Sequence, residues 1–165
     1  MKNGIDPSKV ILRGLPVRPS FWKPSSPKSV IRKQLGLDQN RKTVLLMGGG
    51  DGVGGIENIA THLARSLKKL DISSQMIVIC GHNKVMTDSL SANLKPEDKL
   101  KVSVKGFVNN VDQYMTASDC LVTKAGPGTI AESMIRGLPL VLSYYLPGQV
   151  IIKIDIFFNN KDSFS

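Results

Sequence analysis

The segment KAGPGTIAE at residues 124–132 decides the fold of this chain, because it joins an apolar run to an amphipathic one through a glycine-proline turn. The run CLVT at 120–123 predicts a buried strand, and the following text predicts a helix whose first turn carries Thr129 and Glu132. A helix that begins directly after a strand presents free backbone N–H groups to an anion. The segment therefore predicts a phosphate-binding turn.

A second glycine-rich loop, MGGGDGVGG at 47–55, follows the apolar residues VLL at 44–46. Residues 50–55 match G-x-G-x-x-G, the pattern of dinucleotide-binding proteins. The match is weak, because the next predicted strand ends in ICGH at 79–82, without the acidic residue that would bind a ribose. A tight turn for close helix-strand packing is the alternative without a ligand.

Apolar periodicity alternates between strand and helix along the whole chain. The predicted strands lie at 10–12, 43–47, 75–80, 100–105, 120–123 and 140–143, and the predicted helices at 29–35, 56–69, 84–92, 111–117 and 129–136. This alternation predicts an α/β fold, a Rossmann-like three-layer structure with a parallel sheet between two layers of helices. Ligands of such sheets bind at the carboxyl ends of the strands, where both glycine loops and GFVNN at 106–110 fall.

Length and charge narrow the classes of function. The 165 residues suffice for one hydrophobic core, and no run approaches the roughly 20 apolar residues of a membrane-spanning helix. Residues 1–42 hold ten Lys and Arg against Asp6 and Asp38, a balance of +8, whereas the rest holds twelve against eleven. This basic part suits an anionic membrane surface, although a solvated face is an equal alternative. Because aromatic residues make up only 5%, we expect no nucleic acid partner.

The composition also suggests where one unit ends and the next begins. Residues 14–27, GLPVRPSFWKPSSP, carry four prolines, which is typical of a stiff linker. We therefore expect an interdomain strand and linker at 1–27, one folded domain at 28–149 and a divergent tail at 150–165. No targeting signal is visible at the amino terminus.

Three stretches together carry a family resemblance: LLMGGGDGVGGIE at 45–57, VICGHN at 78–83 and the long segment from VKGFVNN to LPLVL at 104–142. They resemble the C-terminal half of family 28 glycosyltransferases of the GT-B architecture, and among these the monogalactosyldiacylglycerol synthases of plants. The resemblance runs from about residue 8 to residue 149, including GLPVRPSF at 14–21, which looks like the family's crossing between its two domains. The bacterial peptidoglycan N-acetylglucosaminyltransferase is similar more distantly.

The resemblance implies a UDP-sugar site and no metal or other cofactor. In the family, the loop after the first strand approaches the diphosphate, the Gly-Phe-Val segment borders the uracil, and an acidic residue in the helix after the second loop binds the ribose. Glu132 occupies the last of these positions; a carboxylate that merely favours the helix dipole is the alternative for it. The implied site comprises Gly48, Gly49, Gly50, Asp51, Gly52, Phe107, Val108, Lys124, Gly126, Pro127, Gly128, Thr129, Glu132 and Gln149.

The implied reaction is transfer of galactose from UDP-galactose to 1,2-diacylglycerol at the chloroplast envelope membrane. After Gln149 the family continues with an acidic residue and a Gly-Asn pair, where this chain has VIIK at 150–153. The family's N-terminal domain, which binds diacylglycerol and supplies the catalytic base, has no counterpart here, and no residue is assigned a catalytic role. We therefore expect a donor-binding fragment that is inactive alone. A non-catalytic UDP-binding or interaction module and, less favoured, an NAD-type protein are the alternatives.

Overall fold

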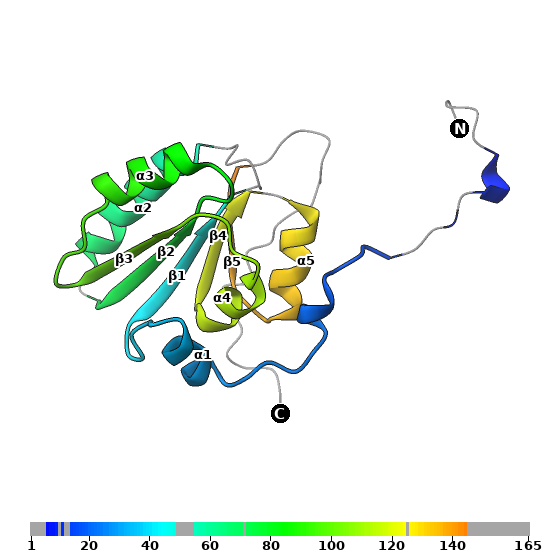
Figure 1. The fold of residues 1–165 in the computed structure, drawn as a ribbon, viewed down its shortest axis with the longest axis horizontal. Helices are drawn as coiled ribbons and strands as arrows, with labels where there is room; N and C mark the ends of the chain where they lie inside the picture. Colours follow the sequence, from blue (N-terminus) through cyan, green and yellow to red (C-terminus); the bar gives the residue numbers. More distant parts are fainter. Residues whose placement is uncertain are drawn as a thin grey trace.

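The computed structural model of this chain describes residues 6–9, 11, 14–48, 55–70, 72–124 and 126–144. Their core is a five-stranded parallel sheet with the strand order β3-β2-β1-β4-β5 (Figure 1). Along the chain, the helices and strands are α1 (Lys28–Gln34), β1 (Lys42–Met47), α2 (Ile56–Lys69), β2 (Ser74–Ile79), α3 (Lys84–Asn93), β3 (Leu100–Lys105), α4 (Val111–Ala117), β4 (Cys120–Lys124), α5 (Pro127–Ile135) and β5 (Leu140–Tyr144). Short 3-10 helices at Pro7–Lys9 and Pro19–Phe21 precede them.

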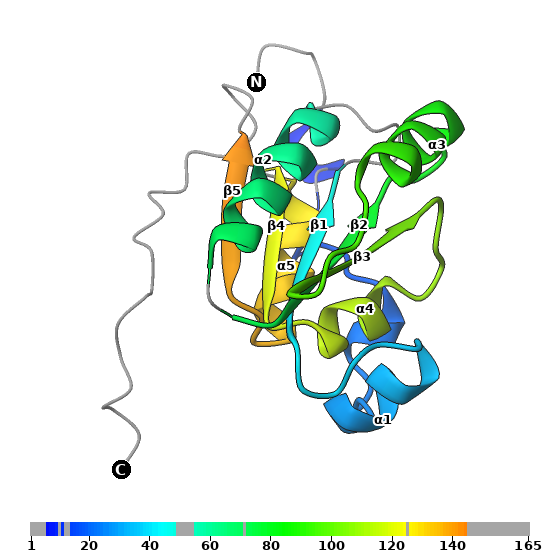
Figure 2. The same cartoon turned by 90° about the vertical axis from the view of Figure 1, so that its left-hand side faces the viewer.

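Neighbouring residues of the strands point to opposite faces of the sheet, as the pleat requires. Leu46 packs in the cluster formed with α2 and α3, and its neighbour Leu45 packs with α4 on the other face. Figures 1 and 2 show α2 and α3 together on one face, and α1, α4 and α5 across the sheet from them. The predicted three-layer α/β fold is confirmed.

Element boundaries follow the predictions closely, and the differences have physical reasons. The predicted bounds of the helices at 56–69 and 111–117 and of the strand at 100–105 are those observed. α5 begins at Pro127, two residues earlier than predicted, because proline lacks the N–H that a first helical residue leaves unpaired and its φ suits a helix. The predicted strand at 10–12 lies largely outside the described residues, and Ile11 belongs to no strand.

Residues 14–27, here called the linker, are docked on the sheet's helical layer. Phe21 is 2% exposed and packs with Leu45, Ile77 and Met115 in the core. Figure 1 shows this part of the linker at the end of α5 farthest from its first turn. The linker is therefore continuous with the core, and its burial against this domain is greater than its proline content alone indicates.

A buried arginine fixes α1 beneath the amino ends of the central strands. Arg32 is 6% exposed and donates to the carbonyl oxygens of Ala117 and Gln39, to Thr43 Oγ1 and, at 2.9 Å, to the Asp119 carboxylate. Asp119 also accepts from the Thr43 N–H and from Lys28 Nζ, both at 2.8 Å. One carboxylate thus joins α1, the start of β1 and the start of β4.

Candidate functional site

The carboxyl edge of the sheet is the candidate site, because the strand order reverses direction there between β1 and β4. A chain that winds outward in both directions from two neighbouring strands leaves a crevice at their carboxyl ends, where ligands of such folds bind. Thr123, 1% exposed, donates its hydroxyl to the carbonyl oxygen of Met47 at 2.8 Å and so joins the two strands just below this point. Gly48 follows directly on β1.

The first turn of α5 supplies the anion-binding groups. Gly126 is the N-cap in an extended conformation, and no side chain caps the helix. Gly128 and Thr129, at the second and third helical positions, have backbone N–H groups without an acceptor inside the helix. The other two residues offer less, since Pro127 has no N–H and the Gly126 N–H donates to the carbonyl oxygen of Lys124 at 2.7 Å. The N–H groups of Gly128 and Thr129 are thus the two main-chain donors of this turn that are open to an anion.

Glu132 lies in the second turn of α5 and faces the linker. The Nε and one terminal nitrogen of Arg18 donate to its two carboxylate oxygens, each at 2.7 Å, while 10% of the Glu132 side chain is exposed. The hydrogen bonds to Glu132 raise the pKa of Arg18 above its ordinary value. The Arg18 guanidinium also lies 5.1 Å from the ring centre of Phe21, and that of Arg136 lies 5.4 Å from it.

This pairing leaves acceptor capacity on the carboxylate. An ionised carboxylate has about four lone-pair sites, and a bidentate guanidinium uses one on each oxygen. Glu132 therefore keeps one site on each oxygen for a second donor pair, such as two neighbouring hydroxyl groups. Arg136, which directly follows α5, adds a second contact with the linker by donating to the carbonyl oxygen of Ser20 at 2.7 Å.

The loop after β3 brings an exposed aromatic residue to the same edge. Phe107 is 63% exposed, and its ring stacks on that of His82 with 4.2 Å between centroids and 15° between planes. The next residue, Val108, packs against the core on the face that holds α4. The main chain at 107–108 is thus held on one side by the core and on the other by the His82 ring.

The carboxyl edge gathers most of the described residues that the sequence singles out. Gly48, Phe107, Val108, Lys124 and the residues 126–129 all lie at or next to strand ends on this edge, and Glu132 lies one turn farther along α5. Gly49, Gly50, Asp51, Gly52 and Gln149 lie outside the described residues. Two partners are missed by the sequence reasoning, which assigns no role to His82 or Arg18. No sequence signal indicates that Arg18 pairs with Glu132 across 114 residues.

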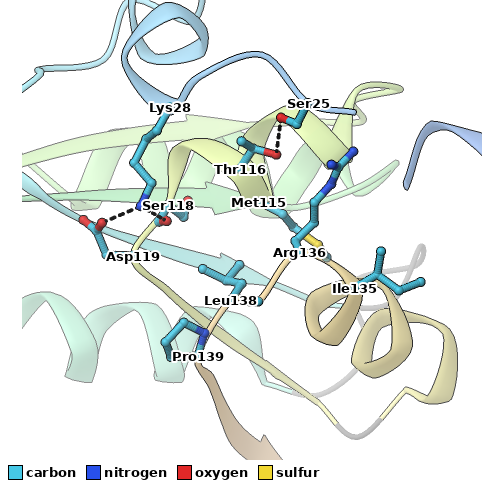
Figure 3. A pocket seen from close by; sticks show the side chains of 11 residues that line it. Ser25, Lys28, Met115, Thr116, Ser118, Asp119, Ile135, Arg136, Leu138 and Pro139 are labelled. Carbon is cyan, nitrogen blue, oxygen red and sulfur yellow. Dashed lines mark hydrogen bonds and ion pairs between the residues drawn. The ribbon is translucent and has the colours of Figure 1, made fainter. Parts of the chain in front are cut away.

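Two other hollows border the sheet. One, of about 470 Å³, lies at the carboxyl edge between the first turns of α2 and α3 and is lined by Gly55, Ile56, Glu57, Asn58, Asn83, Val85 and Met86. The other, of about 360 Å³, lies at the opposite edge, where Lys28 and Asp119 pair at 2.8 Å and Ser25 and Thr116 at 3.2 Å (Figure 3). Among the described residues, no three His, Cys, Asp or Glu side chains gather as a metal site, and no helix could span a membrane.

Comparison with known proteins decides the family. The model of the glycosyltransferase family 28 C-terminal domain matches residues 43–146, which include every strand of the sheet except the first residue of β1. This chain belongs to glycosyltransferase family 28. The matched region of this family 28 chain contains the Phe107–His82 stack, the first turn of α5 and Glu132.

The curated relatives are monogalactosyldiacylglycerol synthases of plants, as the resemblance implies. The chloroplastic synthase of Spinacia oleracea and synthase 1 of Arabidopsis thaliana are each 48% identical over 151 residues. A probable synthase of Glycine max is 49% identical over 152 residues. These matches cover 90% of this chain and 28% of each relative, so the chain spans about 28% of the length of its relatives.

Solved structures confirm the GT-B type of fold. MurG of Acinetobacter baumannii superposes with a TM-score of 0.58 at 19% identity, covering 87% of this chain and 39% of MurG. WaaG, a glycosyltransferase of lipopolysaccharide biosynthesis, gives a TM-score of 0.53, also at 19% identity, over 75% of this chain and 35% of its own. At this identity the likeness shows the fold alone.

Proposed function

We propose that this family 28 chain holds the UDP-galactose donor in a reaction that transfers galactose to 1,2-diacylglycerol, a step in making galactolipids. The observation that carries the proposal is the first turn of α5 beside the crevice between β1 and β4, with Glu132 one turn beyond it. The names of the relatives support the sugar and the acceptor. The same names, which place those synthases in chloroplasts, support a plastid location, and we propose peripheral association with the envelope membrane.

Each part of the site has a physical role in this proposal. The N–H groups of Gly128 and Thr129 donate to the diphosphate, where the positive end of the helix dipole adds up to about 1 kcal/mol. The glycine loop that begins at Gly48 approaches the diphosphate with its main chain, and Lys124 lies at the end of β4 beside it. Glu132 accepts hydrogen bonds from the two ribose hydroxyls on the lone-pair sites that Arg18 leaves open, and Gln149 contacts the sugar.

The division of labour is also part of the proposal. This chain supplies the donor half of the reaction, whereas the resemblance implies that the acceptor site and the catalytic base belong to the family's N-terminal domain. General-base catalysis requires a group within hydrogen-bond reach of the acceptor hydroxyl. No cofactor and no metal take part. A non-catalytic UDP-binding or interaction module is the second candidate, favoured by the described site residues, which supply main-chain donors and a carboxylate acceptor for binding.

Calorimetric titration with UDP and with NAD tests the donor site. We expect the chain to bind UDP in preference to NAD, and we expect Glu132→Ala to weaken UDP binding by about 1–3 kcal/mol, because ribose hydroxyls lose their acceptor. Glu97→Gln is the matched control, since Glu97 pairs with Lys68 far from the carboxyl edge. Equal or stronger binding of NAD would reject the donor site. Unchanged UDP binding by Glu132→Ala would leave Glu132 only its role as the partner of Arg18.

A further inference from the structure

The His82–Phe107 stack is an exposed aromatic pair, and the UDP site described above leaves its histidine without a role. Phe107 is 63% exposed, yet its ring is held against the imidazole with 4.2 Å between centroids and 15° between planes. The two residues come from separate loops, His82 from the end of β2 and Phe107 from the end of β3. An exposed phenylalanine without such a contact would sample several rotamers.

The main chain on both sides of the stack is fixed. Gly81, in the left-handed region at φ 62°, turns the chain directly after β2, and Asn83 caps α3 by accepting the Met86 N–H at 2.9 Å. His82 stands between this turn and this cap, so its position along the edge is set. The main chain at His82 is thus fixed by the turn before it and the helix cap after it, and its imidazole faces Phe107 in the loop after β3.

The two loops also approach each other through their backbones. A Cβ atom on Gly106 would lie 3.6 Å from the carbonyl oxygen of Gly81, and the Cys80 N–H donates to the carbonyl oxygen of Lys105 at 2.8 Å. On its other side, the loop is held by Val108 in the core. On its exposed side, the loop is in contact with the His82 ring through the Phe107 side chain.

We propose that His82 is a positioning residue for base recognition: by stacking on Phe107, it holds the main chain at 107–108 in the place where that chain recognises uracil. The inference rests on the proposed UDP site, together with the family resemblance, which implies that residues 107–108 border the base. Main-chain N–H and C=O groups distinguish uracil from cytosine because the O4 acceptor of uracil is replaced by an N4 donor in cytosine. Such discrimination depends on the position of the main chain at 107–108, and therefore on the His82 ring that stacks on Phe107.

The test compares UDP and CDP binding to the full chain with His82→Ala, His82→Phe and His62→Ala. His62 is the matched control, since it is the other histidine of the sequence and its ring bonds only to the Asn58 carbonyl oxygen on the exposed side of α2. We expect His82→Ala to weaken UDP binding about 2- to 10-fold, the range that corresponds to one aromatic pair, and to lower the preference for UDP over CDP. His82→Phe restores both, and His62→Ala changes neither.

A second readout needs no nucleotide. In the proton NMR spectrum of the free chain, the His82 ring protons should be shifted upfield by the Phe107 ring, and Phe107→Leu should remove that shift. A wild-type chain that shows the shift but does not bind UDP would refute the proposed function, and the role of His82 with it. Binding of UDP by the wild type with an unchanged UDP-to-CDP ratio in His82→Ala would overturn the positioning role alone, as would an absent ring shift.

Discussion

Both carboxylate oxygens of Glu132 accept from one guanidinium, and this pairing joins the linker directly to α5. The Arg18 side chain is 46% exposed and that of Glu132 is 10% exposed, so water reaches one partner far more than the other. An exposed ion pair contributes little, whereas a bidentate pair with one shielded partner contributes more. The Arg18–Glu132 pair therefore holds the linker in place as well as orienting the carboxylate.

A double-mutant cycle on Arg18→Ala and Glu132→Ala measures this link. We expect a coupling free energy of about 1 kcal/mol, reduced by added salt, because the Arg18 end of the pair is half-exposed. Urea unfolding of the wild type, both single variants and the double variant gives this coupling energy. Arg18→Lys is the control for charge alone, since an ammonium cannot form the two parallel hydrogen bonds of the guanidinium fork. Additive single effects would show that the pair is not energetically linked.

Among the elements, α1 owes part of its attachment to the sheet to one carboxylate, that of Asp119. Burial alone would raise the pKa of Asp119, but hydrogen bonds from Lys28 and the Thr43 N–H, together with the charges of Lys28 and Arg32, lower it below its ordinary value. A carboxyl whose folded pKa is depressed stabilises the fold above its unfolded pKa and loses that contribution as the pH falls through the folded value. The attachment of α1 is therefore sensitive to acid.

The variant Asp119→Asn tests this acid sensitivity. At pH 7 we expect it to lower the free energy of unfolding by about 1–2 kcal/mol, a range reduced for the partial exposure of the carboxyl. Below pH 3.8, the ordinary Asp value, the difference in the free energy of unfolding between variant and wild type should shrink. As the wild-type carboxyl becomes protonated, it loses its charge and the stabilisation that the charge provides. Asp88→Asn, on an exposed pair of α3, is the control. A difference that stays constant from pH 7 to pH 3 would contradict the role assigned to Asp119.

Element boundaries show what the sequence could and could not predict. Periodicity alone suffices for α2, because Ile56, Ala60 and Leu67 recur on one face and Gly55 precedes them. The sequence pattern places the start of α5 two residues too late, because a Gly-Pro-Gly segment is typical of a turn, whereas Pro127 is the first helical residue. In the site, strand ends were predictable from the alternation, but the side-chain pairs were not: Arg18 meets Glu132 and His82 meets Phe107 only after distant segments have packed together.

At the scale of the whole molecule, the basic charge of residues 1–42 is less available than its count indicates. Arg32 is buried, and Arg18, Lys28 and Arg41 pair with carboxylates. Lys23 in the linker and Lys33 in α1 are exposed, and Trp22, which precedes Lys23 in the sequence, is 67% exposed. An exposed tryptophan beside a lysine suits the interface of an anionic membrane, because the indole has an apolar body and a polar N–H and the lysine is attracted by the anionic lipids.

Cosedimentation with phosphatidylglycerol vesicles tests this surface. We expect the chain to bind at low ionic strength and to dissociate as salt is added, with about 1 kcal/mol from each well-placed lysine. The double variant Lys23→Glu and Lys33→Glu should lose most of the binding, whereas Lys69→Glu with Lys95→Glu, at the ends of α2 and α3, should retain it. Equal loss of binding in the two double variants would show that net charge alone brings the chain to the vesicles. No binding by the wild type would show that the basic residues form only a solvated face.

The docked linker also determines where this domain could turn relative to a neighbour. Phe21 is enclosed by the core. On either side of the linker–α5 contact, Arg18 bonds to Glu132 and Arg136 bonds to the carbonyl oxygen of Ser20. α1 begins seven residues after Phe21. Force applied to the chain at Arg18 would be passed directly to α5 and the sheet instead of being absorbed by bending. Val17 also packs against the core, so among the described linker residues rotation about a pivot is easiest before it, at Gly14, where an added Cβ would meet no atom within 4 Å.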